Sequence, residues 1–307
     1  MLTKIIGFLD NQIGRASHRK LRYPQLGSGN KCGEIRRVAN LLLDGFDAAL
    51  HTGPIELIQQ IAGLEQAEAR VVYEGAFAAR SSLCLKAESS WTESAPYLTG
   101  IEPLQNAIIG LGYGAATSQL GLPPMVRDTD EYWIWMALDA YGFNRGFLKW
   151  NETIARKEFS LNLPQQAQHA FDQGLGRSLW VGTGARIASI ATLIQEFSPE
   201  RRADLWSGAA LMMGYWGAMS EKELKLALKM SGNHAGNLRQ GIALAALLRS
   251  TSGTVPDHTS GASEIICNMH VNELVNLSAQ LASQSNPNSA RDFFLFQGRL
   301  ISMLGER

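Results

Sequence analysis

The sequence lacks the features of secreted, zinc-binding and membrane-spanning proteins. Its three cysteines, Cys32, Cys84 and Cys267, are far apart and match no zinc spacing, so we expect structural thiols in a cytoplasmic protein. Residues 1–15 reach Asp10 after a short apolar stretch and hold no small-residue cleavage site, which argues against a signal peptide. The longest uncharged run, residues 205–219, is shorter than the roughly 20 residues that span a bilayer, so we expect a buried helix there and no membrane span.

Net charge is also absent. Lysine plus arginine and aspartate plus glutamate both number 28, so the chain has no strong field to attract nucleic acid, and we expect no nucleic-acid partner. Strand-like alternation is nearly absent as well. What remains is a chain of 307 residues with 45% apolar residues, which is enough for a large helical core.

Internal repetition is the strongest positive signal. Segments such as RRVANLLLDGFDAALHTG and LQNAIIGLGYGAATSQLG recur about every 65 residues. Each of these segments holds a first anchor glycine, and a second anchor glycine follows it about 30 residues later. The first anchors are Gly45, Gly112 and Gly176, and the second are Gly75, Gly142 and Gly208. The pattern predicts an all-α helical repeat array of about four units, curved or closed around an apolar interior. We expect an N-terminal arm at 1–33 and a single domain at 34–307, with units near 34–100, 101–163, 164–220 and 221–307.

Local signals place some of the helices and their contacts. Ser198 and Pro199 predict the start of one helix, and Thr183 predicts the start of another over residues 184–194. The anchor glycines lie within helical patterns, where glycine is unfavourable, so we expect them to permit close contacts between helices. A fourth, looser copy places Gly261 at the second anchor position.

Four motifs carry a family resemblance: YEGA at 73–76, LDAYGF at 138–143, GLGRSLW at 174–180 and RRADLWSG at 201–208. The chain from about 38 to 217 resembles a bacterial family of unknown function that recurs beside polyketide synthases in enediyne gene clusters. The resemblance implies a role in specialised-metabolite biosynthesis and no particular catalytic residue. The chain departs from the family pattern at Ala76, Ala140 and Asn144, where we expect glycine, glycine and histidine.

Acidic residues close to the second anchors are the first candidates for chemistry. In a closed array, equivalent positions face one interior, so Glu74, Asp139, Asp204 and Asp257 would form a ring of carboxylates for acid catalysis or cation binding. The alternative is that these acids cap helices or pair with Arg201, Arg202 and Arg145.

The segment DTDE is the second candidate. It resembles the acid motif of class II terpene cyclases, with Asp130 as the proton donor and Asp128 and Glu131 beside it. Its alternative is a solvated first helical turn. Aromatic residues that would line a substrate cavity and stabilise a carbocation are Trp133, Trp135, Trp180, Trp206, Tyr215 and Trp216.

The sequence contains no motif that is typical of other catalytic mechanisms. It holds no DDxxD, HExxH, Walker loop or GxSxG, so we expect no cofactor or metal, with Mg²⁺ needed only for a diphosphate substrate. Two hypotheses remain. One is a cyclase, lyase or isomerase that encloses an apolar polyene or isoprenoid intermediate. The other is a non-catalytic helical-repeat binder or scaffold. A homodimer is compatible with both.

Overall fold

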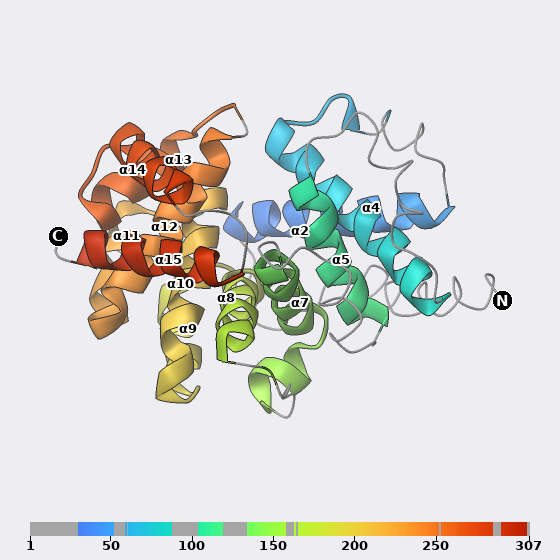
Figure 1. Ribbon diagram of the computed structural model, residues 1–307, viewed down its shortest axis with the longest axis horizontal. Coiled ribbons are helices and arrows are strands. Elements are labelled where there is room, and N and C mark those ends of the chain that lie inside the picture. Colours follow the sequence, from blue (N-terminus) through green and yellow to red (C-terminus); the bar gives the residue numbers. More distant parts are fainter. Residues whose placement is uncertain are drawn as a thin grey trace.

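The computed structural model describes residues 30–51, 59, 61–87, 104–118, 134–157, 163, 165–251, 253–284 and 290–305. Helices account for 86% of the described structure, and strands are absent from it, which confirms the all-α prediction (Figure 1). The helices are α2 (Asn30–His51), α4 (Gln66–Lys86), α5 (Leu104–Ser118), α7 (Ile134–Leu148), η2 (Asn151–Ala155), α8 (Gln165–Gly182), α9 (Ile187–Gln195), α10 (Pro199–Trp216), α11 (Glu221–Ser231), η3 (Gly232–His234), α12 (Ala235–Ser250), α13 (Asp257–Ala262), η4 (Ser263–Cys267), α14 (Val271–Ser283) and α15 (Ala290–Gly305).

The long helices pack on one another in chain order. α2 packs on α4, α4 on α5, and the series continues through α7, α8 and α10 to α12. α15 returns across this series and contacts both α12 and α7 (Figure 1). The start of α4 also meets the end of α12, because Arg70 Nη2 donates to the Thr251 carbonyl at 3.2 Å and Arg249 Nη1 lies 3.3 Å from Glu65 Oε1. The described helices therefore bend far enough for an early helix to touch a late one.

Two anchor glycines make the contact between α2 and α4. A β-carbon at Gly45 would overlap the carbonyl oxygen of Val72, and one at Gly75 would overlap the carbonyl oxygen of Leu42. Only glycine lets the two backbones approach this closely, so its cost within a helix is offset by the packing that it permits.

The third copy repeats this contact between α8 and α10. A β-carbon at Gly176 would overlap the carbonyl of Leu205, and one at Gly208 would overlap the carbonyl of Gln173. Gly75 of α4 therefore packs on α2, and Gly208 of α10 packs on α8 in the same way. Gly261 does not repeat the contact, because a β-carbon there would meet no atom within 4 Å.

In the second copy the crossing lies two residues before the anchor predicted from the sequence. Gly112 packs on Ala137 and on the β-carbon of Ala140, whereas Gly142 packs on Phe171 of the following helix. The position that corresponds to Gly75 is therefore Ala140. Superposition of whole units stays a prediction.

Helix ends agree with the sequence at one site and differ at another. α10 begins at Pro199 after Ser198, as predicted. Thr183 does not start a helix, because its hydroxyl donates back to the Leu179 carbonyl and closes α8. The next two residues, Gly184 and Ala185, have φ angles of 66° and 57°, which break the helix before α9 begins at Ile187.

The run 205–219 lies mostly inside α10, and the residues from Leu205 to Gly214 are buried there as predicted. Trp206 is fully buried. Cys84 and Cys267 are buried and are not part of a disulfide. Among the described helices none is both long and apolar enough for a membrane crossing. α2 starts at Asn30, within the segment expected as an N-terminal arm, and the rest of that segment lies outside the described residues.

Candidate active site

The helices line a partly open cavity of about 270 Å³. Its walls come from α4, α5, α7, α8, α10, α12, α14 and α15, so segments from most of the described chain meet there. An engineered protein cavity of about 150 Å³ stays dry and holds benzene. This cavity therefore has room for a larger organic molecule.

Aromatic rings form part of the wall. Trp135 of α7 stacks on Phe293 of α15 with ring centroids 3.4 Å apart and planes inclined by 4°. Tyr215 and Trp216, at the end of α10, line the same cavity. The Arg249 guanidinium lies 4.5 Å and 5.3 Å from their ring centroids, and its Nε donates to the Tyr215 carbonyl at 2.8 Å. These contacts hold both rings in place.

A charged cluster interrupts the apolar wall. Asp139 of α7 forms a salt bridge with Arg177 of α8 through Oδ1, and both side chains line the cavity beside Glu74 of α4. Asp139 is only 4% exposed, whereas Glu74 is half-buried because part of its surface faces the cavity. Both acids lie in the middle of their helices, so they cannot act as helix caps.

The cluster changes the proton affinity of its members. Burial raises the pKa of Glu74, Arg177 opposes the increase, Asp139 adds to it and Arg70 opposes it, so that the pKa of Glu74 is about 7. Burial also raises the pKa of Asp139, while its salt bridge to Arg177 favours the ionised form. Arg177 stays charged, because nearby acidic groups raise its pKa against the effect of burial. Glu74 is therefore the acid of the cluster that changes protonation near neutral pH.

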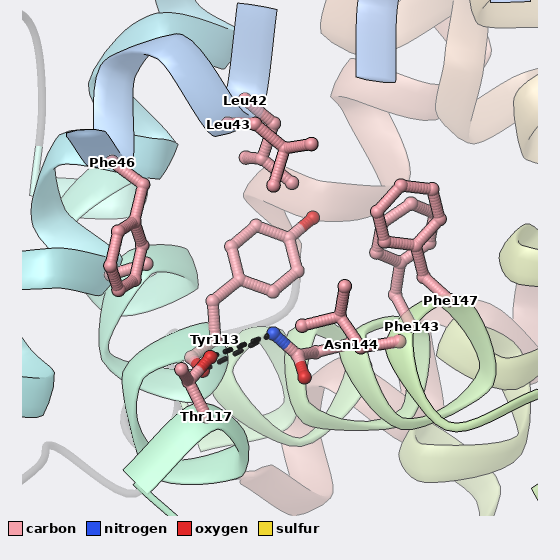
Figure 2. Close-up of a pocket in the computed structure, with 10 residues that line it drawn as sticks. Leu42, Leu43, Phe46, Tyr113, Thr117, Phe143, Asn144 and Phe147 are labelled. Atoms are coloured by element: carbon pink, nitrogen blue, oxygen red, sulfur yellow. Dashed lines mark hydrogen bonds between the residues drawn. The ribbon is translucent and has the colours of Figure 1, made fainter. Parts of the chain in front are cut away.

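Two smaller pockets continue beyond this cluster. One, of about 40 Å³, shares Glu74 and Arg177 with the main cavity and is also lined by Tyr113 and Trp180. The next, of about 20 Å³, has Tyr113 at its centre (Figure 2). There Asn144 Nδ2 donates to Thr117 Oγ1 at 3.1 Å. Asn144, where the family pattern led us to expect histidine, thus lies in the small pocket and not in the main cavity.

The structure brings some of the predicted site residues together and separates others. Six of them line the cavities: Glu74, Asp139, Trp135, Tyr215 and Trp216 surround the main one, and Trp180 lines the adjoining pocket. Trp206 lines none of these three pockets. Asp128, Asp130, Glu131 and Trp133 lie outside the described residues, so their roles stay predictions.

Asp204 and Asp257 do not join the cluster. Asp204 Oδ2 lies 2.7 Å from His169 Nδ1, and the His169 side chain is 39% exposed. Asp257 is exposed in the first turn of α13, where its charge favours the helix dipole. Among the described residues no group of three or more histidine, cysteine and acidic side chains is arranged to hold a metal ion.

Sequence reasoning missed Arg177. The residue lies within GLGRSLW, but a single arginine gives no sign that it points inward until its partner is known. Phe293 was missed because the repeat pattern does not show that α15 returns to α7 and lines the cavity.

Fold and site together define an all-α protein with a mainly apolar cavity and an acidic group on its wall whose pKa is raised to about 7. A sequence profile of the family described as "Protein of unknown function (DUF1702)" matches residues 15–300, so the chain belongs to that family. Neither the curated proteins nor the solved structures contain a match to the chain.

Proposed function

We propose that the protein binds an apolar small molecule inside the helical array and transfers a proton to it from Glu74. The observation that carries the proposal is the position of Glu74, an acid with a pKa of about 7, on the wall of an aromatic-lined cavity. An acid with this pKa is half-protonated near neutrality, which suits general acid catalysis.

The wall chemistry favours an alkene substrate. Protonation of a carbon–carbon double bond creates a carbocation, and the faces of Trp135, Tyr215 and Trp216 can stabilise positive charge. Loss of a proton from a neighbouring carbon to the Glu74 carboxylate would complete an isomerisation or cyclisation, restore the protonated acid and leave the redox state unchanged. Polyene and isoprenoid intermediates of bacterial specialised metabolism provide such double bonds.

The proposed donor is Glu74, because it lines the cavity. Asp130 lies outside the described residues. A role for Asp130 stays a separate prediction. The alternative function is a non-catalytic binder or scaffold. Two acids on the wall of a cavity with room for a small organic molecule support the enzyme, whereas a scaffold that holds a partner protein would present an extended surface. A homodimer stays a prediction.

Incubation with isoprenoid alcohols and diphosphates of increasing length, with product analysis by gas chromatography and mass spectrometry, tests this proposal. Diphosphates are tested with and without Mg²⁺. We expect Glu74→Gln to keep ligand binding and to lose at least 100-fold in turnover, a typical loss for a missing general acid. Asp204→Asn is the matched control, because it changes an acid outside the cavity. Full activity of Glu74→Gln would overturn the proposed role.

A further inference from the structure

Two buried polar atoms on one face of α7 have no hydrogen-bond partner among the described residues. They are Oδ2 of Asp139, the carboxylate oxygen that Arg177 does not occupy, and Nε1 of the Trp135 indole. Asp139 is buried, with an exposed fraction of only 4%. An unsatisfied buried group costs about 1–3 kcal/mol, so the protein bears a cost at both atoms that a bound group can remove.

The two atoms are suited to bind one group together. Trp135 and Asp139 are four residues apart on α7, so their side chains are neighbours on the helix surface, and both line the main cavity. The indole N–H can only donate, and the ionised carboxylate can only accept. A ligand group that fits both must therefore accept one hydrogen bond and donate another.

We propose that the ligand of this cavity is an apolar alcohol, with its hydroxyl group bound between Trp135 and Asp139. A hydroxyl accepts from the indole N–H and donates to the carboxylate, so it satisfies both atoms. A carboxylate or a fully ionised phosphate offers no donor to Asp139, and an ammonium group offers no acceptor to Trp135. The inference rests on the proposed function, because it takes the cavity to be a ligand site and adds the class of ligand.

Trp180 and Trp206 also have buried indole N–H groups without a partner among the described residues. Trp180 lines the adjoining pocket, but no buried, unpartnered acceptor of the described chain lines that pocket with it. Trp206 lines neither the main cavity nor the adjoining pocket. The feature that indicates a ligand is thus the donor and the acceptor side by side on a cavity wall. Trp206 provides a matched control for a substitution at Trp135.

The test compares geraniol with 2,6-dimethyl-2,6-octadiene, the hydrocarbon that has the same skeleton without the hydroxyl. Affinities are measured by competition with a fluorescent apolar probe. A site built to bond a hydroxyl discriminates strongly against the analogue that lacks it, so we expect geraniol to bind at least tenfold more tightly. Trp135→Phe keeps an aromatic ring against Phe293 but removes the donor, and it should lower this ratio at least threefold. Trp206→Phe should leave the ratio unchanged.

The outcomes separate this inference from the proposed function. Equal affinity for the two compounds would overturn the alcohol and leave an apolar ligand site, with water satisfying the two polar atoms. A ratio that falls equally in Trp135→Phe and Trp206→Phe would also overturn it, because the effect would then be structural. If neither compound displaced the probe, both the proposed function and the ligand class would be wrong.

Discussion

Two acids of this protein line one cavity, and two acids at similar places in the sequence lie away from it. Glu74 and Asp139 meet Arg177 in the interior, whereas Asp204 pairs with the partly exposed His169 and Asp257 is exposed. Their chemistry differs accordingly. Burial raises the pKa of Glu74 to about 7, while a hydrogen bond to Asp204 is the largest cause of the raised pKa of His169.

Register along the helix explains the difference. Glu74 immediately precedes the crossing residue Gly75, and Asp139 immediately precedes Ala140, the crossing residue of the second copy. The two acids are therefore equivalent. Asp204 lies four residues before Gly208, and Ser207 occupies the equivalent place, where its hydroxyl donates to Gln240. Asp204 thus lies about one helical turn nearer the start of α10 than the position equivalent to Glu74 and Asp139, and there it meets His169 instead of the cavity.

Trp206→Ala should have the largest effect on stability, because it removes a fully buried side chain from the packed side of α10. We expect a loss of about 3–5 kcal/mol in the free energy of unfolding, measured by chemical denaturation. Trp216→Ala, on the cavity side of the same helix, should cost less, because Trp216 is half-buried beside existing space. Equal losses would contradict the contrast between a packed side and a cavity side.

Asp139→Asn should destabilise the protein by about 3 kcal/mol, because it leaves the buried Arg177 cation without its partner. The Asp139 and Arg177 side chains are 6% and 15% exposed, so solvent screens the lost pair only weakly. Urea denaturation of the variant measures the loss. A change below about 1 kcal/mol would mean that water reaches Arg177 and that the interior cluster is solvated.

Glu74→Gln should stabilise the protein at alkaline pH. The pKa of Glu74 is raised from 4.5 to about 7 in the folded state, so folding favours the protonated form. The free energy of unfolding should therefore fall as the pH rises from about 4.5 to 7, and this fall should be absent from the variant. At pH 8 the variant should be more stable by about 1–3 kcal/mol. If the two proteins had parallel stability curves, Glu74 would be solvated.

Asp204→Asn should have the smallest effect, within about 1 kcal/mol, because its His169 partner is partly exposed. The raised pKa of His169 means that this pair stabilises the fold at low pH and loses its effect as the pH rises through that pKa. Proton NMR titration should show a lower His169 pKa in the variant. A loss as large as that of Asp139→Asn would remove the distinction between inner and outer acids.

The sequence predicted the helices and the close contacts at glycine, because helical periodicity and glycine within helices are local signals. It placed Glu74, Asp139, Trp135, Tyr215 and Trp216 among the site residues, and the structure brings these together. It could not separate Asp204 from them, since a shift of one helical turn leaves the periodic pattern intact.

The partner of Asp139 was beyond sequence reasoning. Arg177 is 38 residues away along the chain, and pairing at that distance depends on how two helices pack. The Ala140 register was hidden for a similar reason. Gly142 suggested a closer match to the other anchors. In the second copy, however, the residue that faces Gly112 at the crossing is Ala140, so this contact between α5 and α7 has glycine on one helix and alanine on the other.

The most direct test of the cavity acid is an infrared titration of the Glu74 carboxyl group. The carbonyl band of the protonated acid is assigned by its absence from Glu74→Gln and is followed as the pH increases. We expect half of the band to remain near pH 7, since burial raises the pKa of Glu74 to about 7. Loss of the band near pH 4.5, the ordinary value for glutamate, would show that Glu74 faces water and would contradict the account of an acid held in an apolar interior.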